Sequence, residues 1–238
     1  FMKKLVVLSG AGISVESGGS TFRGANGLWG KYPIEQVATP EGYASDPELV
    51  LNFYNDMRRQ LLTSLPNKGH KLIAELEKEF NVTVVTQNID DLHERAGSTR
   101  VIHLHGELTK VCSSYSPYDQ RYVKELPPEE YNIKVGDLAP DGSQYRPYIV
   151  WYGEAVPKID EAIQYVQEAD IFLIIGTSLN VYPAAGLLNY VPFKTPVYLV
   201  DPNEVTVNTN HHHSHVIRKV ASEGMSEFVR LLTGQVNA

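Results

Sequence analysis

The chain alternates between short, almost wholly apolar runs and longer segments in which apolar residues recur at helical spacing. The apolar runs occupy residues 5–8, 82–85, 101–104, 171–175 and 197–200, and the helical segments occupy residues 69–80, 159–169 and 226–232. Apolar runs without polar alternation are typical of parallel strands that are covered on both faces. Strands that alternate with helices predict an α/β fold with a doubly wound parallel sheet.

Two segments are too long to be ordinary connections. They occupy residues 24–66, with a helical stretch near 47–62, and residues 109–148, which are rich in Tyr, Pro and Ser. Loops of this length without structure of their own are uncommon. We therefore expect one domain, residues 1–238, in which both segments form a smaller inserted module. The larger part of that domain then comprises residues 1–23, 67–108 and 149–238.

A polar or glycine-rich cluster follows each predicted strand. The five clusters are Gly10-Ala11-Gly12, Gln87-Asn88-Ile89-Asp90, His103-Leu104-His105-Gly106, Gly176-Thr177-Ser178 and Asp201-Pro202-Asn203. The carboxyl ends of parallel strands meet at one edge of a sheet, where open α/β folds bind ligands. The cluster at 87–90 could also be an ordinary helix start, since Asn and Asp cap helices. Taken together, the clusters predict the walls of a shared cleft.

Charge and cysteine content narrow the choice of partners. The 21 basic residues against 28 acidic ones give a net charge of −7, which disfavours nucleic acid as a partner. No run of about 18 apolar residues is present, so we expect no membrane partner. Cys112 is the only cysteine, which excludes an intramolecular disulfide and fits a reducing, cytoplasmic location. His211-His212-His213 is more typical of a surface loop than of a metal site.

The first cluster suits a phosphate group. Glycines without Cβ atoms let backbone N–H groups approach an anion at a strand-to-helix turn, although such glycines also serve plain packing. The dinucleotide fingerprint G-x-G-x-x-G is incomplete, because position 15 is Val15, and no second strand ends in an acidic residue about 20 residues later. Hydride transfer is therefore the less favoured use of a nucleotide cofactor here.

Five motifs, in order and over nearly the whole chain, resemble those of the sirtuins. They are residues 10–18 with Thr21-Phe22-Arg23 and Gly27-Leu28-Trp29; residues 86–90; residues 103–106; Val150-Trp151-Tyr152-Gly153-Glu154; and residues 176–179. Sirtuins are NAD-dependent protein lysine deacylases with a Rossmann-like large domain and a small domain that usually holds zinc. The resemblance implies acyl transfer from lysine to ADP-ribose with release of nicotinamide. It implies acyl-lysine proteins or peptides as partners, and we expect a monomer of bacterial type.

The resemblance also implies the residues that bind NAD. They are Gly10, Ala11, Gly12, Glu16, Phe22, Arg23, Trp29, Gln87, Asn88, Ile89, Asp90, Gly176, Thr177, Ser178, Asp201 and Ala221. Within this set, the first glycine cluster and Ser178 would hold the pyrophosphate. Gln87 and Asn88 would orient the nicotinamide ribose, and Ile89 and Asp90 would hold the nicotinamide carboxamide.

The catalytic residues that the resemblance implies are His105 and Asn88. A free imidazole titrates near pH ~6.5, so His105 can act as a general base at neutral pH. In the family mechanism that base activates a ribose hydroxyl, which captures the acyl group. The alternative is a buried, hydrogen-bonded core histidine, an interpretation that we prefer for His103.

The implied substrate-binding residues are Tyr54, Met57, Val150, Trp151, Tyr152, Gly153, Glu154 and Val181. Trp151 and Tyr152 could instead be ordinary aromatic core. Sirtuins that remove negatively charged acyl groups carry a Tyr and, three residues later, an Arg. Here Tyr54 fits but Met57 replaces the Arg, while Arg58 and Arg59 lie about 100° and 200° further round the helix. We therefore expect a pocket with one hydroxyl and one apolar side chain, which favours uncharged acyl groups.

The chain departs from the family in two further places. Most sirtuins have two cysteine pairs after the histidine motif, whereas here only Cys112 is present, followed by serines. We expect no zinc and a module that is held by packing of tyrosines instead, namely Tyr115, Tyr118, Tyr122, Tyr131 and Tyr145. Gly19 stands where sirtuins usually carry a larger residue. Two other functions stay open: a protein ADP-ribosyltransferase that uses the same NAD site, and a non-catalytic NAD-sensing module.

Overall fold

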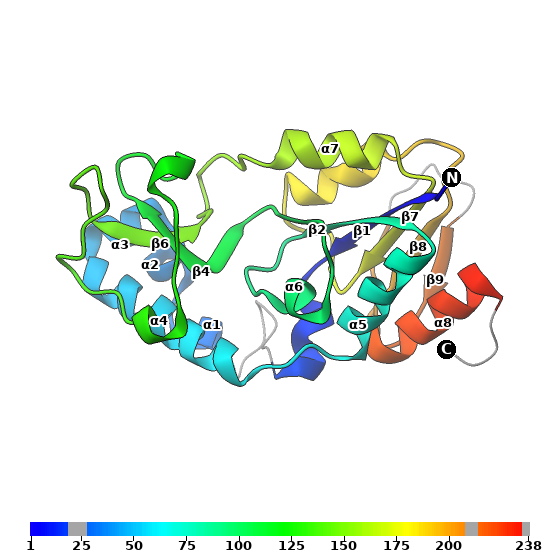
Figure 1. Cartoon of the computed structure of the whole chain (residues 1–238), viewed down its shortest axis with the longest axis horizontal. Coiled ribbons are helices and arrows are strands. Elements are labelled where there is room, and N and C mark those ends of the chain that lie inside the picture. Colours follow the sequence, from blue (N-terminus) through cyan, green and yellow to red (C-terminus); the bar gives the residue numbers. More distant parts are fainter. Residues whose placement is uncertain (19–27, 208–213, 235–238) are drawn as a thin grey trace.

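The structure, a computed structural model, describes residues 1–18, 28–207 and 214–234. Figure 1 shows two parts side by side along the long axis: a parallel sheet with its helices, and a smaller module of helices and short strands. The α/β prediction, with a doubly wound sheet and a smaller inserted module, is confirmed. Among the residues described, no helix has the length and apolar character needed to cross a membrane.

The large part is built on one six-stranded sheet in the order β3-β2-β1-β7-β8-β9, with every neighbouring pair parallel. The strands are β1 (Lys4–Ser9), β2 (Asn81–Thr86), β3 (Val101–His103), β7 (Ile171–Ile175), β8 (Val197–Val200) and β9 (Ser214–Ile217). The five expected strands are confirmed. The edge strand β9 was missed because it is polar and only Ile217 in it is buried.

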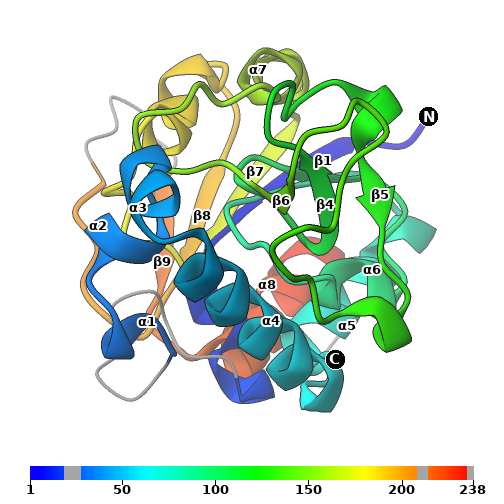
Figure 2. The same ribbon diagram turned by 90° about the vertical axis from the view of Figure 1, so that its left-hand side faces the viewer.

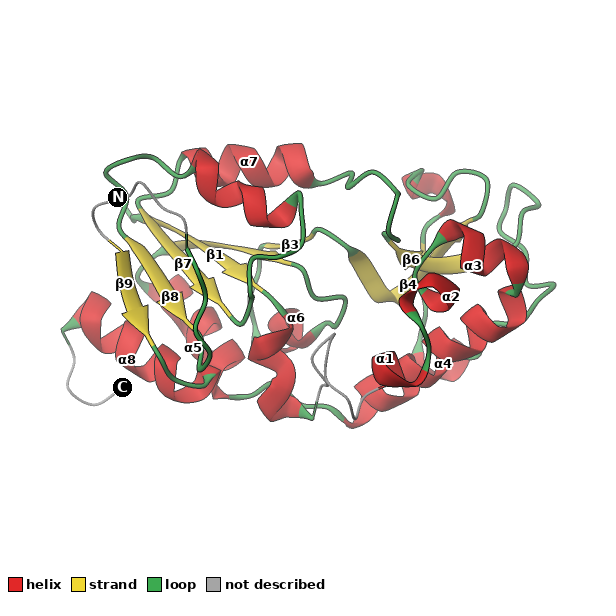
Figure 3. Ribbon diagram, turned by 180° about the vertical axis from the view of Figure 1, so that it is seen from behind, coloured by secondary structure: helices red, strands yellow, loops and turns green. Residues whose placement is uncertain are grey.

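Helices cover both faces of the sheet (Figure 3), and the sequence of β1 shows why. Leu5 and Val7 pack into one core with α5 (Lys68–Glu75), the short 3₁₀ helix η2 (Leu76–Lys78) and α8 (Ala221–Thr233). Val6 and Leu8 pack into a second core with α7 (Ile159–Gln167) and the 3₁₀ helix η5 (Ala184–Tyr190). Alternate residues of a strand point to opposite faces, so a run that is apolar throughout requires cover on both.

The small module joins helices from one expected segment to strands from the other (Figure 2). Its helices are α1 (Leu28–Lys31), α2 (Ile34–Val37), α3 (Pro40–Ser45) and α4 (Pro47–Thr63). Its antiparallel sheet has the order β5-β4-β6, formed by β5 (Lys124–Glu125), β4 (Gly106–Ser113) and β6 (Tyr145–Ile149), with the 3₁₀ turns η3 (Gln120–Tyr122) and η4 (Pro128–Glu130) between them. The module sheet thus begins directly after His105. Gly106 permits the change of direction, because its φ is +91° and a Cβ there would lie 2.1 Å from the Tyr148 carbonyl oxygen.

Serine and aspartate hydrogen bonds tie the module loops together. Ser113 and Ser143 are buried, and both hydroxyls donate to the Asp141 carboxylate. The Ser113 oxygen also accepts the backbone N–H groups of Tyr115 and Ser116 at 3.0 and 2.9 Å. We call this group the Ser113–Asp141–Ser143 cluster. It joins a turn after β4 to the loop before β6.

The expected tyrosine packing is only partly present. Tyr131 is buried and Tyr145 packs against the same apolar cluster, but Tyr115 is 79% exposed, so the expectation is wrong for that residue. A side chain at the tip of a hydrogen-bonded turn has no core to enter. Cys112 is fully buried in β4, with its sulfur 3.7 Å from the Pro147 carbonyl oxygen, and burial raises the pKa of its thiol to about 12.

Candidate active site

A cleft of about 900 Å³ lies between the carboxyl edge of the parallel sheet and the small module. Most of the residues predicted for a site line it. From the sheet edge these are Ala11, Gly12, Gln87, Asn88, Ile89, Asp90, His105, Gly176, Thr177, Ser178 and Asp201; from the module side and the neighbouring loops they are Tyr54, Met57, Val150, Trp151, Tyr152, Gly153, Glu154 and Val181. The polar segment after β2 is therefore one wall of a shared cleft.

Some predicted cofactor residues lie elsewhere. The Glu16 carboxylate accepts the backbone N–H of Ser222 at 3.0 Å and also the Ser222 hydroxyl, so it ties η1 (Ala11–Ser17) to the start of α8. Ala221 is 5% exposed and packs in the core of the large part. Neither residue is among those that line the cleft. Phe22 and Arg23 lie outside the described residues, and of Trp29 only the backbone, in α1, is described.

The glycine turn after β1 is packed backbone to backbone against the turn after β7. The Gly10 N–H donates to the Ile175 carbonyl at 3.0 Å, and the Gly12 N–H donates to the Gly176 carbonyl at 2.8 Å. A Cβ on Gly12 would lie 2.6 Å from the Gly176 Cα atom. Gly10 lies behind the cleft lining. A Cβ on Gly10 would lie 2.7 Å from the Thr177 Cβ atom, so no side chain fits there. Packing alone therefore requires these glycines, and a phosphate-binding role would be additional to it.

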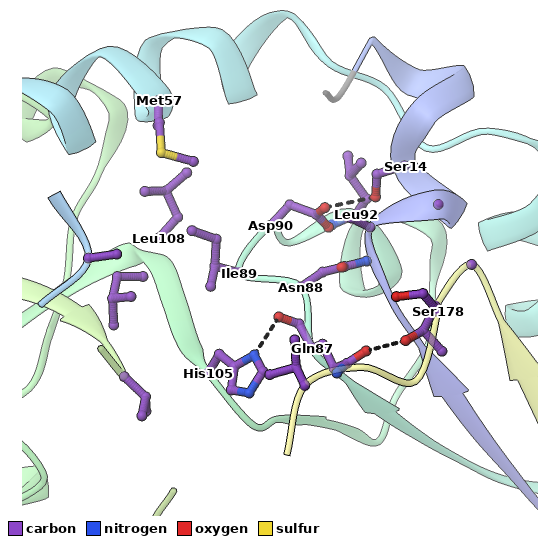
Figure 4. A pocket seen from close by; sticks show the side chains of 18 of the residues that line it. Ser14, Met57, Gln87, Asn88, Ile89, Asp90, Leu92, His105, Leu108 and Ser178 are labelled. Atoms are coloured by element: carbon purple, nitrogen blue, oxygen red, sulfur yellow. Dashed lines mark hydrogen bonds between the residues drawn. The ribbon is translucent and has the colours of Figure 1, made fainter. Parts of the chain in front are cut away.

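His105 presents one ring nitrogen to the cleft. Its Nδ1 lies 3.2 Å from the Gln87 carbonyl oxygen (Figure 4). A carbonyl can only accept, so Nδ1 carries the hydrogen and Nε2 keeps its lone pair. Within the described ranges Nε2 has no hydrogen-bond partner. Burial lowers the pKa of His105 below its ordinary value, against a smaller opposing effect of the Gln87 carbonyl. A neutral imidazole with a free lone pair can take up a proton.

His103, two residues earlier, has a different environment. Its ring is 4% exposed, Nδ1 lies 2.8 Å from the Asn88 carbonyl oxygen, and Nε2 lies 3.0 Å from the Glu94 carboxylate. The interpretation of His103 as a buried, hydrogen-bonded residue is confirmed. Burial lowers its pKa, but the hydrogen bond and charge of Glu94, together with the charge of Glu107 and the Asn88 carbonyl, outweigh burial and raise the pKa above the ordinary value.

Asn88 and Asp90 are fixed by neighbouring loops. The Asn88 side-chain amide donates to the Gly10 carbonyl at 3.0 Å, which leaves its Oδ1 without a hydrogen-bond partner in the described part of the chain. The Asp90 carboxylate accepts the Ser14 hydroxyl at 2.8 Å and the Leu92 N–H at 3.1 Å, and burial raises its pKa. The sequence prediction did not include Ser14, although it lies inside the first motif. A small hydroxyl residue directly after the glycine turn was the available signal.

The module and the sheet edge together form an apolar wall, with Met57 and Leu108 from the module and Ile89 from the segment after β2. Figure 4 shows the side chains of Met57, Ile89 and Leu108 close together at the end of the cleft away from Ser178. Leu108 was not predicted, because nothing in the sequence indicates that β4 returns toward α4. Tyr54 is fully buried; its hydroxyl donates to the Val37 carbonyl at 2.8 Å and accepts from the Trp151 ring N–H at 3.0 Å. The expectation that the pocket offers this hydroxyl is therefore wrong, since its only hydrogen is already used.

The two arginines of α4 bind groups other than this wall. Arg58 is fully buried and donates to the Leu108 carbonyl at 2.8 Å and to Asn55 at 2.8 Å, while Arg59 pairs with Asp56 on the exposed side of α4. Among the residues described, neither arginine lines the cleft.

Two predicted substrate residues, Glu154 and Trp151, are held by Arg146. The Glu154 carboxylate accepts both Arg146 terminal nitrogens at 2.9 Å and the Trp151 backbone N–H at 2.8 Å. The guanidinium lies 3.8 Å above the Trp151 ring, which is 2% exposed. Both residues line the cleft, but the carboxylate is engaged and Trp151 also serves as aromatic core. Tyr152, by contrast, is 45% exposed.

Comparison with known proteins gives consistent matches. The model of the Sir2 family matches residues 10–183. A protein of Bacteroides thetaiotaomicron named NAD-dependent protein deacylase is 67% identical over 97% of this chain and 98% of its own length, and one of Helicobacter pylori with the same name is 54% identical over 84% and 85%. Among solved structures, a Sir2 homologue bound to ADP-ribose superposes with a TM-score of 0.84 at 38% identity, covering 99% of this chain and 96% of that chain. A Sir2 protein with deacetylated p53 peptide and 3'-O-acetyl ADP-ribose superposes with a TM-score of 0.79 at 31% identity, covering 98% and 94%.

Proposed function

The chain belongs to the Sir2 family, and from this premise we propose that His105 is the general base of its reaction and that the small module selects the acyl group. The activity is NAD-dependent protein deacylation, and NAD is the cofactor. The observation that carries the proposal is the hydrogen bond from His105 Nδ1 to the Gln87 carbonyl, which leaves Nε2 as the acceptor in the cleft.

The residues of the cleft fit a dinucleotide. The volume of about 900 Å³ is large, the glycine turn after β1 presents backbone to it, and polar side chains follow along the sheet edge. We assign the pyrophosphate to Ala11, Gly12 and Ser178 with Gly10 behind them. The nicotinamide ribose goes to Gln87 and Asn88, the carboxamide to Ile89 and Asp90, and the adenosine ribose to Asp201. Phe22 would shield the ribose carbon from which nicotinamide departs, and Arg23 would face the phosphate and ribose.

The chemistry divides between cofactor and protein. When bound, NAD supplies a ribose carbon that accepts the acyl oxygen as nicotinamide leaves. His105 Nε2 takes the proton of a ribose hydroxyl, which makes that oxygen able to attack the acyl carbon. The Gln87 carbonyl holds the tautomer that this step needs, because it accepts the hydrogen on Nδ1.

We propose that the acyl groups removed are uncharged, with acetyl preferred. The wall of Met57, Ile89 and Leu108 offers only apolar surface, and the Tyr54 hydroxyl has no hydrogen left to donate. A carboxylate that enters such a pocket leaves water without a partner, which is costly. An arginine would answer it with a bidentate pair, but Arg58 is turned into the module.

The finer points of the assignment are proposals as well. We propose a bacterial-type enzyme without zinc, in line with the bacterial relatives and with a single, buried cysteine. A monomer suffices, because both walls of the cleft come from one chain. We also propose a cytoplasmic location, with neither nucleic acid nor membrane as partner; the net charge of −7 supports the first exclusion.

Product analysis tests the proposed function. Purified protein is incubated with NAD and an acetyl-lysine peptide, and the products are identified by mass. We expect deacylated peptide, nicotinamide and O-acetyl-ADP-ribose in equal amounts. ADP-ribose attached to protein would indicate ADP-ribosyl transfer instead, and unchanged NAD would indicate a non-catalytic protein; either result contradicts the proposal.

A further inference from the structure

Two histidines hold two successive carbonyl groups of the same segment. His105 donates to the Gln87 carbonyl at 3.2 Å, and His103 donates to the Asn88 carbonyl at 2.8 Å. This segment directly follows β2, and both of its residues, Gln87 and Asn88, line the cleft. The two side chains are identical in chemistry, so their partners on the other ring nitrogen decide what each can do.

The partners of His103 require a charged ring. Its Nδ1 faces a carbonyl oxygen, and its Nε2 lies 3.0 and 3.1 Å from the two Glu94 oxygens. Neither a carbonyl nor an ionised carboxylate has a hydrogen to give, so both ring nitrogens must carry one. A neutral imidazole would leave one of these buried contacts without a hydrogen.

We propose that His103, held as an imidazolium by Glu94 from α6 (Leu92–Ala96), is a positioning residue that fixes Asn88 at the nicotinamide end of the cleft. Two other contacts complete the fixation of Asn88: its N–H donates to the Thr86 hydroxyl at 3.0 Å, and its side-chain amide donates to the Gly10 carbonyl at 3.0 Å. With these three contacts made, Oδ1 and the second hydrogen of the side-chain amide are left for a ligand. This inference rests on the proposed function, which places Asn88 against the nicotinamide ribose.

The charges around His103 favour its cationic form. Glu94 on α6, Glu107 on β4 and Asp90 after β2 are acidic groups whose charges interact with it, and His93 on α6 also interacts with it. Atoms of Glu94, His103 and Glu107 lie within 4.8 Å of one another, a spacing that could suit a metal ion. The imidazolium itself supplies the positive charge there, and Lys110 pairs with Glu107 at 2.9 Å.

The pH dependence follows from the sign of the shift. Because Glu94, with Glu107 and the Asn88 carbonyl, raises the pKa of His103 in spite of burial, the charged ring persists above the ordinary value of 6.5 and is lost as the pH rises through the raised value. The positioning, and with it turnover, should then decline on the alkaline side. The lowered pKa of His105 acts on the acid side, so the two histidines limit opposite ends of the profile.

The test compares Glu94→Gln and His103→Gln with His70→Gln. His70 is a suitable control because it is also fully buried, it lies on α5 outside the cleft lining, and glutamine preserves an acceptor for the Asn67 N–H. The readouts are kcat, peptide KM, the pH profile of kcat, and the protonation of the His103 ring by ¹⁵N NMR.

We expect wild-type His103 to carry hydrogen on both nitrogens in most molecules at pH 6.5, the ordinary pKa value for histidine. In Glu94→Gln and His103→Gln, kcat should fall by about tenfold, as for loss of one hydrogen bond to a charged group, with little change in peptide KM. In Glu94→Gln the alkaline limb should move to lower pH. His70→Gln should keep the wild-type kcat and profile.

A mainly neutral His103 ring at pH 6.5, or wild-type kcat and pH profile in both test variants, would overturn the inference. The NMR measurement does not need activity. An inactive wild type would therefore count against the proposed function, while the charge state of His103 is still tested.

Discussion

The sheet edge and the small module face the same cleft but use their polar groups in opposite ways. At the sheet edge, hydrogen bonds occupy one side of each functional group and leave the other toward the cleft, as in His105 and Asn88. In the module, the Tyr54 hydroxyl, Arg146 and Glu154 are paired internally, and apolar surface such as Met57 faces the cleft. The comparison supports the proposal that the edge performs the chemistry and the module selects the substrate.

The largest effect is expected when the general base, His105, is removed from the sheet edge. In His105→Ala we expect the deacylation kcat to fall roughly 10²–10⁴-fold, the usual contribution of a general base. NAD binding, measured by calorimetry, should be largely unchanged, because the ring is one contact among many along the edge. Normal turnover by this variant would remove His105 from the mechanism.

We expect the same residue to set the acid limb of wild-type activity. A base with a lowered pKa stays neutral until the pH falls below that value. We therefore expect the acid limb of kcat/KM to lie below pH 6.5, the ordinary value for histidine. An acid limb above pH 6.5 would contradict the neutral, buried state of His105.

Local patterns in the sequence were sufficient for the edge but not for the module. Apolar runs located β1, β2, β3, β7 and β8, and parallel pairing brought their ends together. The order of motifs located the residues of the cleft in the same way. The start of the module sheet at Gly106 rather than at 109 lies within the usual uncertainty of element boundaries.

The failures came from contacts between distant residues. Ser113 forms hydrogen bonds with Asp141 and Ser143, which lie 28 and 30 positions away in the sequence. No local sequence pattern predicts so distant a partner for a serine. The use of the Tyr54 hydroxyl depends on Trp151, 97 positions away. Glu16 lies within a cofactor motif, yet its carboxylate accepts a hydrogen bond from Ser222, which only the folded chain brings near.

The Ser113–Asp141–Ser143 cluster is expected to stabilise the module. In Ser113→Ala the N–H groups of Tyr115 and Ser116 lose their acceptor, and Asp141 loses a donor. We expect the free energy of unfolding to fall by about 1–3 kcal/mol, as for buried groups left unpaired. Chemical denaturation measures this change.

The matched control is Ser116→Ala, because the Ser116 hydroxyl has no hydrogen bond in the described ranges; its effect should stay within about 0.5 kcal/mol.

Dialysis against a chelator should leave the unfolding midpoint of the wild type unchanged, and elemental analysis should find much less than one zinc per chain. Stoichiometric zinc, or unfolding by the chelator, would show that a metal holds the module.

The division between edge and module is tested most directly by the ratio of kcat/KM for acetyl- and succinyl-lysine peptides of one sequence, in the wild type, Met57→Arg and Met57→Leu. The account predicts that the wild type and Met57→Leu remove acetyl faster than succinyl. In Met57→Arg the ratio should fall by about tenfold, since an arginine can pair with the succinyl carboxylate. Faster removal of succinyl than of acetyl by the wild type would contradict the account.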